Sequence, residues 1–182
     1  MTKTPPPTLE TERLVLRPFT LADSDFIMEL LNTEGYLKYI ADRNIKSTED
    51  AELYLQSGPL KSYAEYGFGL CKILLKARNG EADGGEAVGM CGLLWHDYLP
   101  SPDVGYALLP QYEGKGYGRE SAEAVLRWGF EECGISTILA IVLPQNYGSV
   151  RLLERLGMKL QKTIIKPETG DELLLYSISA SM

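Results

Sequence analysis

The chain is predicted to fold as one mixed α/β domain, with a central sheet of about six to seven strands and helices on both of its faces. Its 182 residues are 45% hydrophobic and 24% charged, which suits one globular domain. Short β-rich stretches are interspersed with stretches that repeat apolar residues every three or four positions. No internal repeat or linker divides the chain. We therefore expect a flexible tail over residues 1–8 and a single domain over residues 9–182.

The first elements are a strand and two helices. Apolar and polar residues alternate at Arg13–Phe19, which is typical of a strand. A threonine or serine followed three residues later by an aspartate, as at Thr20–Asp23 and Ser47–Asp50, is a helix start signal. The second of these helices is expected to end at Ser57–Pro59, because glycine and proline interrupt helices.

Three strands are expected in the middle of the chain, at Gly67–Leu75, Glu86–Trp95 and Asp103–Pro110. The first two are separated by the polar, glycine-rich sequence KARNGEADGG, which predicts a hairpin.

The last elements alternate between helix and strand. Apolar residues of one helical face run over 122–133, and Gly134 is the expected C-cap. The apolar stretch Ser136–Pro144 predicts a central buried strand. A short helix is expected between Asn146 and Gly157. Two strands close the chain, Met158–Lys166 and Glu172–Ser179.

Charge and residue counts exclude several classes of protein. The net charge of −7 argues against a nucleic-acid-binding protein, which would show a basic surface. Three scattered cysteines and one histidine indicate neither a disulfide framework nor a zinc site. No apolar run has the length of a signal peptide or of a membrane helix, so we expect a cytoplasmic protein with no membrane partner.

The most informative stretch is QYEGKGYGRES, at Gln111–Ser121, which has a glycine at every second position before a helix. It does not match the P-loop pattern, because position 109 is leucine and position 116 is glycine. Nor does it match a dinucleotide-binding loop, which needs GxGxxG and an acid at the end of the next strand. That strand ends here in LPQN.

Two interpretations of this stretch stay open at the level of the residues. One is a tight strand-to-helix turn. The other is an anion site, in which glycines let successive N–H groups converge and the helix adds its positive end. Lys115 and Arg119 would then add charge to outer phosphates, or would simply be solvated side chains.

Three runs together resemble a known family. LPQYEGKGYGRESAEAVL resembles the acyl-CoA-binding signature of the GNAT N-acetyltransferases, and QNYGSVRLLERLGM resembles their second signature. The opening LETERLVLRPFTLAD is similar to the RimJ/RimL group, which acetylates the N-termini of ribosomal proteins. The resemblance covers the chain from about Leu9 onward.

This resemblance implies a sheet that splays between the fourth and fifth strands, Asp103–Pro110 and Ser136–Pro144. The pantetheine arm of acetyl-CoA, the implied cosubstrate, would lie in that gap beside backbone around Ala107–Leu109. No metal is implied. The cofactor-binding residues that the resemblance implies are Leu108, Leu109, Glu113, Gly114, Lys115, Gly116, Tyr117, Gly118, Arg119, Asn146 and Ser149.

The implied reaction is direct attack of an amine on the thioester, with a backbone N–H near Leu108 stabilising the oxyanion. Asp103 is a candidate general base, or a solvated carboxylate at the start of a strand. Ser149 is a candidate donor to the leaving sulfur, or a helix-start hydroxyl, and Asn146 caps that helix, binds the cofactor, or does both. Further candidates are the bases His96 and Asp97 and the proton donor Tyr147.

The acceptor is the least specified part. The segment Gly35–Asn44, with Tyr36 and Tyr39, is expected at its mouth, opposite the turn Pro167–Asp171. Asp42, Glu168 and Asp171 would attract a cationic acceptor, or are solvated.

The RimJ/RimL-like opening favours a protein N-terminal amine as acceptor. The alternatives are a small amine (a polyamine, amino acid or antibiotic), a non-catalytic acyl-CoA-binding regulatory domain, and a nucleotide-binding scaffold. We expect a monomer or homodimer.

Overall fold

The computed structural model describes residues 3–76 and 85–180. Most of the predicted hairpin loop KARNGEADGG therefore lies outside the described residues. The strands on either side of it pair antiparallel. Within the described ranges, no helix has the length and apolar character needed to cross a membrane.

One mixed sheet of eight strands forms the centre of the molecule, in the order β1-β2-β3-β4-β5-β6-β8-β7. Every neighbouring pair is antiparallel except β5 and β6, which run parallel. The mixed sheet is confirmed, and the two-residue strand β1 is the strand that the sequence pattern missed. The strands are β1 (Leu9–Glu10), β2 (Leu14–Pro18), β3 (Leu70–Leu75), β4 (Ala87–Leu94), β5 (Asp103–Leu108), β6 (Thr137–Val142), β7 (Lys159–Ile165) and β8 (Glu172–Ser179).

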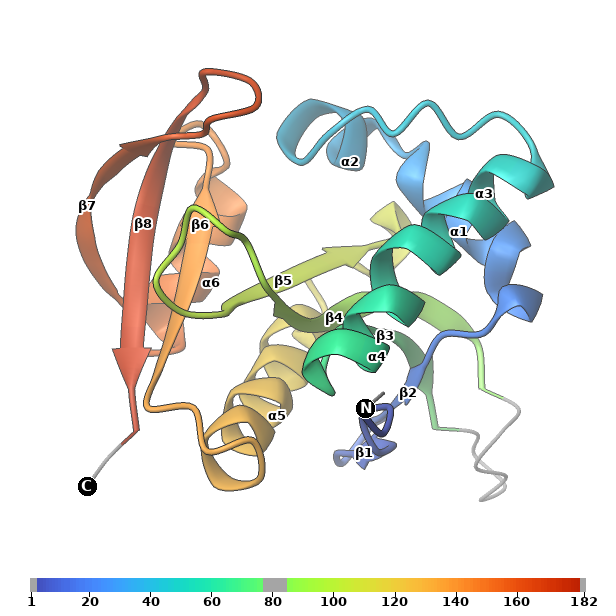
Figure 1. The fold of residues 1–182 in the computed structure, drawn as a ribbon, viewed down its shortest axis with the longest axis horizontal. Coiled ribbons are helices and arrows are strands. Elements are labelled where there is room, and N and C mark those ends of the chain that lie inside the picture. Colours follow the sequence, from blue (N-terminus) through green and yellow to red (C-terminus); the bar gives the residue numbers. More distant parts are fainter. Residues whose placement is uncertain (1–2, 77–84, 181–182) are drawn as a thin grey trace.

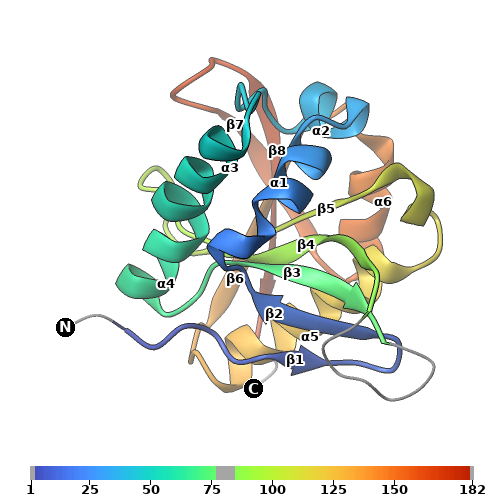
Figure 2. The same ribbon diagram turned by 90° about the vertical axis from the view of Figure 1, so that its right-hand side faces the viewer.

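Helices cover both faces of the sheet, as predicted. Helices α1, α3 and α4 lie together over one face, and α5 lies against the opposite face (Figures 1 and 2). The helices are α1 (Ser24–Leu31), α2 (Glu34–Tyr39), α3 (Thr48–Leu55), α4 (Lys61–Tyr66), α5 (Tyr117–Glu131) and α6 (Tyr147–Arg155). Shorter turns are the 3-10 turns η1 (Leu21–Asp23) and η3 (Pro110–Tyr112) and the π-helical turn η2 (Gln56–Leu60).

The predicted end of the second helix at Ser57–Pro59 is wrong. The helical path continues from α3 through η2 into α4 and ends at Gly67, whose φ is 77°. Proline has no N–H and crowds the preceding turn of an ordinary α-helix. The wider π-helical turn accommodates Pro59, so the chain need not leave the helical path.

A glycine on α5 sets how closely this helix packs on the sheet. A Cβ at Gly129 would lie 2.8 Å from Cδ1 of Ile138 and 3.1 Å from Cδ1 of Leu93. Both Ile138 and Leu93 are fully buried. Glycine therefore allows the C-terminal part of α5 to pack directly on β4 and β6.

A buried carboxylate joins the first strand to the first helices. Asp23, 3% exposed, accepts hydrogen bonds from Arg17 at 2.8 and 2.9 Å and from Lys72 at 2.8 Å. It also accepts the backbone N–H of Thr20, which completes the predicted start signal. Burial alone would raise the pKa of Asp23, but the hydrogen bonds from Arg17 and Lys72 hold it well below its usual range.

We predict that Asp23→Asn lowers the free energy of unfolding by about 2–3 kcal/mol at pH 7, because it removes the buried charge that balances the partly buried Arg17 and Lys72. The lowered pKa means that this stabilisation is complete above the unfolded-state pKa of about 3.9 and is lost as the pH falls below it. Urea unfolding at pH 7 and at pH 3 measures both effects. Asp25→Asn, on the exposed side of α1, is the matched control. Equal stability of the two variants at pH 7 would contradict the prediction.

Candidate active site

The sheet opens between its two parallel strands. The ladder between β5 and β6 contains the single pair Asp103–Leu139, and the N–H of Leu139 donates to the carbonyl of Pro102 at 2.9 Å. Beyond this point the two strands diverge (Figure 1). The predicted splay between the Asp103–Pro110 and Ser136–Pro144 segments is therefore confirmed.

The register of β5 on β4 determines which backbone groups face the gap. The N–H of Leu109 donates to the carbonyl of Val88 at 2.8 Å. Hydrogen-bonded and non-hydrogen-bonded pairs alternate along an antiparallel ladder, so the N–H groups of Tyr106 and Leu108 point away from β4. The N–H of Leu109 is therefore bonded to β4, and the side chain of Leu109 is 3% exposed. Of the two predicted cofactor-binding residues Leu108 and Leu109, only Leu108 points its backbone N–H into the gap.

The glycine stretch presents a set of backbone donors at the start of α5. Gly114 and Gly116 have φ of 71° and 86°, a left-handed conformation that favours glycine. Within the described part of the chain, no acceptor bonds the N–H groups of residues 114–119. These donors stand at the positive end of a 15-residue helix. They fit a pyrophosphate, since a helix N-terminus with free N–H groups favours anions.

The side chains of this loop are placed as follows. Nζ of Lys115 lies 5.2 Å from the ring centre of Tyr112, and Nε of Arg119 donates to Glu123 at 2.7 Å. The N–H of Glu113 donates to the carbonyl of Pro110 at 3.2 Å, so it is not free for a ligand. Gly118 is buried, and its missing Cβ would lie 3.1 Å from Cδ1 of Leu152 on α6.

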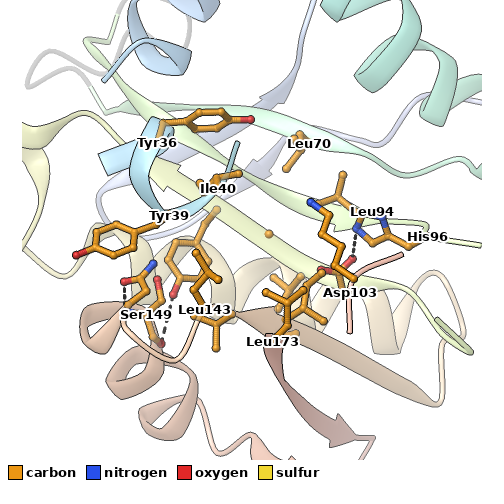
Figure 3. Close-up of a pocket in the computed structure, with 18 of the residues that line it drawn as sticks. Tyr36, Tyr39, Ile40, Leu70, Leu94, His96, Asp103, Leu143, Ser149 and Leu173 are labelled. Carbon is orange, nitrogen blue, oxygen red and sulfur yellow. Dashed lines mark hydrogen bonds and ion pairs between the residues drawn. The ribbon is translucent and has the colours of Figure 1, made fainter. Parts of the chain in front are cut away.

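A cavity of about 210 Å³ occupies the gap. It brings together three of the predicted catalytic residues, Asp103, Asn146 and Ser149, with His96. Figure 3 shows His96 and Asp103 at one end of the cavity and Ser149 at the other. Tyr36 and Tyr39 of α2 also line it.

His96 and Asp103 face each other across the connection from β4 to β5. Nε2 of His96 lies 3.2 Å from Oδ1 of Asp103, whose side chain is 4% exposed. This distance is that of an ion pair, but the atoms are not aligned as a hydrogen bond, and Oδ1 has no hydrogen-bond partner among the described groups. The Asp103 carboxylate raises the pKa of His96 above its ordinary 6.5, although burial opposes this.

The other end of the cavity is formed by the start of α6. The side chain of Asn146 accepts the N–H of Ser149 at 3.2 Å, so Asn146 is a helix cap. The hydroxyl of Tyr106 donates to the carbonyl of Ser149 over 3.5 Å. Burial raises the pKa of Tyr106 to about 12, so this hydroxyl stays protonated at neutral pH.

Most of the other candidates from the sequence lie outside this cavity. Asp97 accepts the indole N–H of Trp95 at 3.2 Å, and Tyr147 is 68% exposed. Asp171 lines the cavity, whereas Asp42 does not.

Three tyrosines of the cavity, Tyr54, Tyr98 and Tyr106, were not among the sequence candidates for the site. Tyr106 follows Val104 on the same face of β5, a placement that strand alternation would have indicated. Tyr98 belongs to the connection after β4, and its buried hydroxyl has no hydrogen-bond partner among the described residues. No local sequence signal marks Tyr98, because its position depends on how that connection folds back.

A groove of about 480 Å³ adjoins the cavity. The two hollows share six lining residues, and the far wall of the groove is formed by η2 and α4, with Tyr66 and Trp95 stacked 5.8 Å apart. Glu168 lines the groove. The shared residues are Arg43, Tyr54, Leu70, Leu94, His96 and Tyr98.

Across residues 3–76 and 85–180, no three histidine, cysteine, aspartate or glutamate side chains are grouped to hold an ion.

Comparison with known proteins agrees with this geometry. The family model for the acetyltransferase (GNAT) domain matches residues 13–159. The uncharacterized N-acetyltransferase YnaD of Bacillus subtilis is 27% identical over 151 residues, which are 83% of this chain and 82% of YnaD.

Solved structures show the same similarity. An acetyltransferase from Agrobacterium tumefaciens is 28% identical, with a TM-score of 0.78 over 96% of this chain and 95% of that one. RimL, a ribosomal L7/L12 α-N-protein acetyltransferase solved with coenzyme A, has a TM-score of 0.76 at 17% identity, over 95% of this chain and 98% of that one. From the matched domain, the relatives and the fold, the chain belongs to the GNAT family of acetyltransferases.

Proposed function

We propose that this acetyltransferase transfers the acetyl group of acetyl-CoA to the α-amine of a protein or peptide N-terminus. The observation that carries the proposal is the groove of about 480 Å³ that adjoins the cavity at His96. The cavity alone would suffice for a small amine. A groove that continues from it offers space for the residues that follow an N-terminal amine.

The cofactor is proposed to lie along the opposite approach. Its pyrophosphate would take the free N–H groups of residues 114–119, and its pantetheine arm would run beside the gap-facing backbone of Leu108. Asn146 and Ser149 border the same gap at the start of α6. Bound there, acetyl-CoA supplies an activated thioester. Lys115, Tyr117 and Arg119 stay proposed contacts of the outer phosphates or the nucleotide.

The thioester carbonyl is proposed to meet the N–H of Tyr106. Tyr106 lines the cavity, whereas Leu108 lies closer to the glycine loop and outside it. Both N–H groups face the gap. The N–H of Tyr106 would bind the oxyanion, and the N–H of Leu108 would bind the pantetheine arm. A backbone donor aimed at developing charge in a site shielded from water stabilises the transition state strongly.

The amine is proposed to arrive from the groove and lose its proton to His96, directly or through water. An α-amine with a pKa of about 7.7–8.0 is already about a tenth neutral at pH 7, so a modest base is enough. Asp103 would hold the imidazole and stabilise its protonated form. At the far end of the cavity, Ser149 would donate a hydrogen bond to the departing sulfur.

A small-molecule acceptor is the second candidate. The chain is 26% identical over 166 residues to a protein of Aspergillus fumigatus called FsC-acetyl coenzyme A-N(2)-transacetylase, covering 84% of this chain and 65% of that protein. The cavity of about 210 Å³ suits a compact amine, so the acceptor assay must include both classes.

The first prediction concerns the cofactor. Gly116→Trp should raise the Kd for CoA by about a hundredfold or more, because its side chain crowds the donors that hold a charged phosphate. Gly134→Trp is the matched control, since Gly134 also has positive φ and lies beyond the other end of α5. Calorimetric titration with CoA measures both. Unchanged affinity in Gly116→Trp would reject this placement of the cofactor.

The second prediction concerns pH. His96 must be neutral to accept a proton, so kcat/KM should rise with pH through a pKa above 6.5. Asp103→Asn should move this rise to lower pH, because it removes the charge that raises the pKa. His96→Gln should lower kcat about a hundredfold and leave only the rise in kcat/KM that deprotonation of the acceptor amine itself causes. Lys166 and Glu168 also act on His96, in opposite directions. A pH profile that is unchanged in His96→Gln would assign the base elsewhere.

The third prediction concerns the acceptor. Thiol release from acetyl-CoA should be faster with free N-terminal peptides than with N-terminally blocked peptides that contain lysine, or with polyamines and amino acids. Peptides of several residues should have a lower KM than single amino-acid amides, because they also fill the groove. Turnover confined to small amines would establish the second candidate. Binding of CoA without turnover of any amine would identify a non-catalytic acyl-CoA-binding domain.

A further inference from the structure

The turn between β1 and β2 is attached to the glycine loop through one carboxylate. Glu120, in the first turn of α5, accepts the hydroxyl of Thr11 at 2.6 Å and the backbone N–H of Arg13 at 2.9 Å on the same oxygen. Its other oxygen accepts Nε of Arg13 at 2.6 Å. The side chain of Glu120 is 16% exposed. The turn therefore has a fixed position relative to the start of α5.

From this position Arg13 reaches the loop itself. Its NH1 donates to the carbonyl of Lys115 at 3.0 Å, and its guanidinium lies 4.7 Å from the ring centre of Tyr117. One side chain thus holds the carboxylate of Glu120 and the carbonyl of Lys115 at once. The planar, forked guanidinium can do this, whereas a lysine ammonium on a flexible stem is poorly suited to it.

The Lys115 carbonyl shares a peptide unit with the N–H of Gly116. This unit is trans, and in a trans peptide the C=O and N–H point in opposite directions. A hydrogen bond that holds the carbonyl toward Arg13 therefore turns the N–H of Gly116 away from Arg13, into the loop. Gly116 has φ of 86°, and its own carbonyl accepts the N–H of Glu120 at 3.0 Å, so α5 fixes one side of the residue and the bond from Arg13 holds the peptide unit on the other.

We propose that Arg13 is a positioning residue for cofactor binding, which aims the Gly116 N–H at a phosphate of CoA through its hydrogen bond to the Lys115 carbonyl. This inference rests on the proposed use of the glycine loop as the phosphate site. Arg13 is not itself the phosphate ligand, because its charge is paired with Glu120 at 2.6 Å. An exposed ion pair contributes little to stability, so its value lies in the orientation that it imposes.

The test compares CoA binding by calorimetry in the wild type, Arg13→Ala, Arg13→Lys and Glu120→Gln. Arg13→Ala and Arg13→Lys should each raise the Kd about tenfold, because neither orients the peptide unit. Glu120→Gln should weaken binding in the same direction, since Arg13 loses its anchor. Lys76→Ala is the matched control: it removes an exposed pair with Glu10, at 3.1 Å, beside the same strands and away from the loop. It should bind as the wild type does.

A second measurement separates orientation from stability. The ¹⁵N–¹H resonance of Gly116 should move downfield when CoA binds to the wild type and should move much less in Arg13→Lys at saturating CoA. Thermal unfolding of each variant identifies any that do not fold, and Arg13→Lys and Glu120→Gln serve if Arg13→Ala is one of them.

The outcomes are distinguishable. If the wild type does not bind CoA, the proposed function fails at the cofactor site. If the wild type binds and Arg13→Ala binds equally well with the same Gly116 shift, the proposed function stands and the role of Arg13 is rejected. Wild-type affinity in Arg13→Lys, or tighter binding in Glu120→Gln, would show that Arg13 acts as a charge near the phosphate, which also overturns the inference.

Discussion

The single residue pair that joins β5 to β6 is the constraint on which the rest of the site depends. The ladder contains only Asp103 and Leu139, so β5 and β6 are not paired over the remaining length of β5. Backbone donors of Tyr106 and Leu108 that would have bonded a neighbouring strand face a gap instead. Unpaired backbone groups are costly when buried, so such a gap favours an extended ligand that can bond them.

The two ends of this gap are built in different ways. At the closed end, the turn from β4 to β5 brings His96 to 3.2 Å from Asp103, the residue at which the strands part. At the open end lie the backbone N–H groups of residues 114–119, next to left-handed glycines and to Arg13, which donates to the carbonyl of Lys115. A titratable pair suits proton transfer and a set of fixed dipoles suits an anion, so the two ends fit the two substrates of an acetyl transfer.

Local signals in the sequence predicted local structure well. The start signal at Ser47–Asp50 is present as a reciprocal pair of hydrogen bonds, and Asn146 caps α6 as expected. The splayed sheet also followed, because the family resemblance implied it. What the sequence did not show depends on distant contacts. The helix passes Pro59 through a π-helical turn, which no local pattern distinguishes from a helix end.

The pairing of His96 with Asp103 was missed for the same reason. Each was a separate candidate in the sequence, and only the antiparallel register of β4 on β5 brings them together. The link from Thr11 and Arg13 to Glu120 spans more than 100 positions of the chain. Such contacts leave no periodic pattern and no characteristic spacing in the sequence, so they can be identified only in the folded structure.

A net charge of −7 disfavours the approach of a polyanionic cofactor, so the contacts made by the charged residues near the glycine loop matter for the proposed binding. The cations nearest the loop are engaged elsewhere: Arg13 with Glu120, and Arg119 with Glu123 at 2.7 Å. Lys115 lies over the ring of Tyr112. In the proposed complex, binding would rest chiefly on backbone dipoles that act at short range, and Lys115 and Arg119 would add contacts to the outer phosphates. If the cofactor binds in this way, an acidic protein gains selectivity, because an anion that does not reach the N–H groups is repelled.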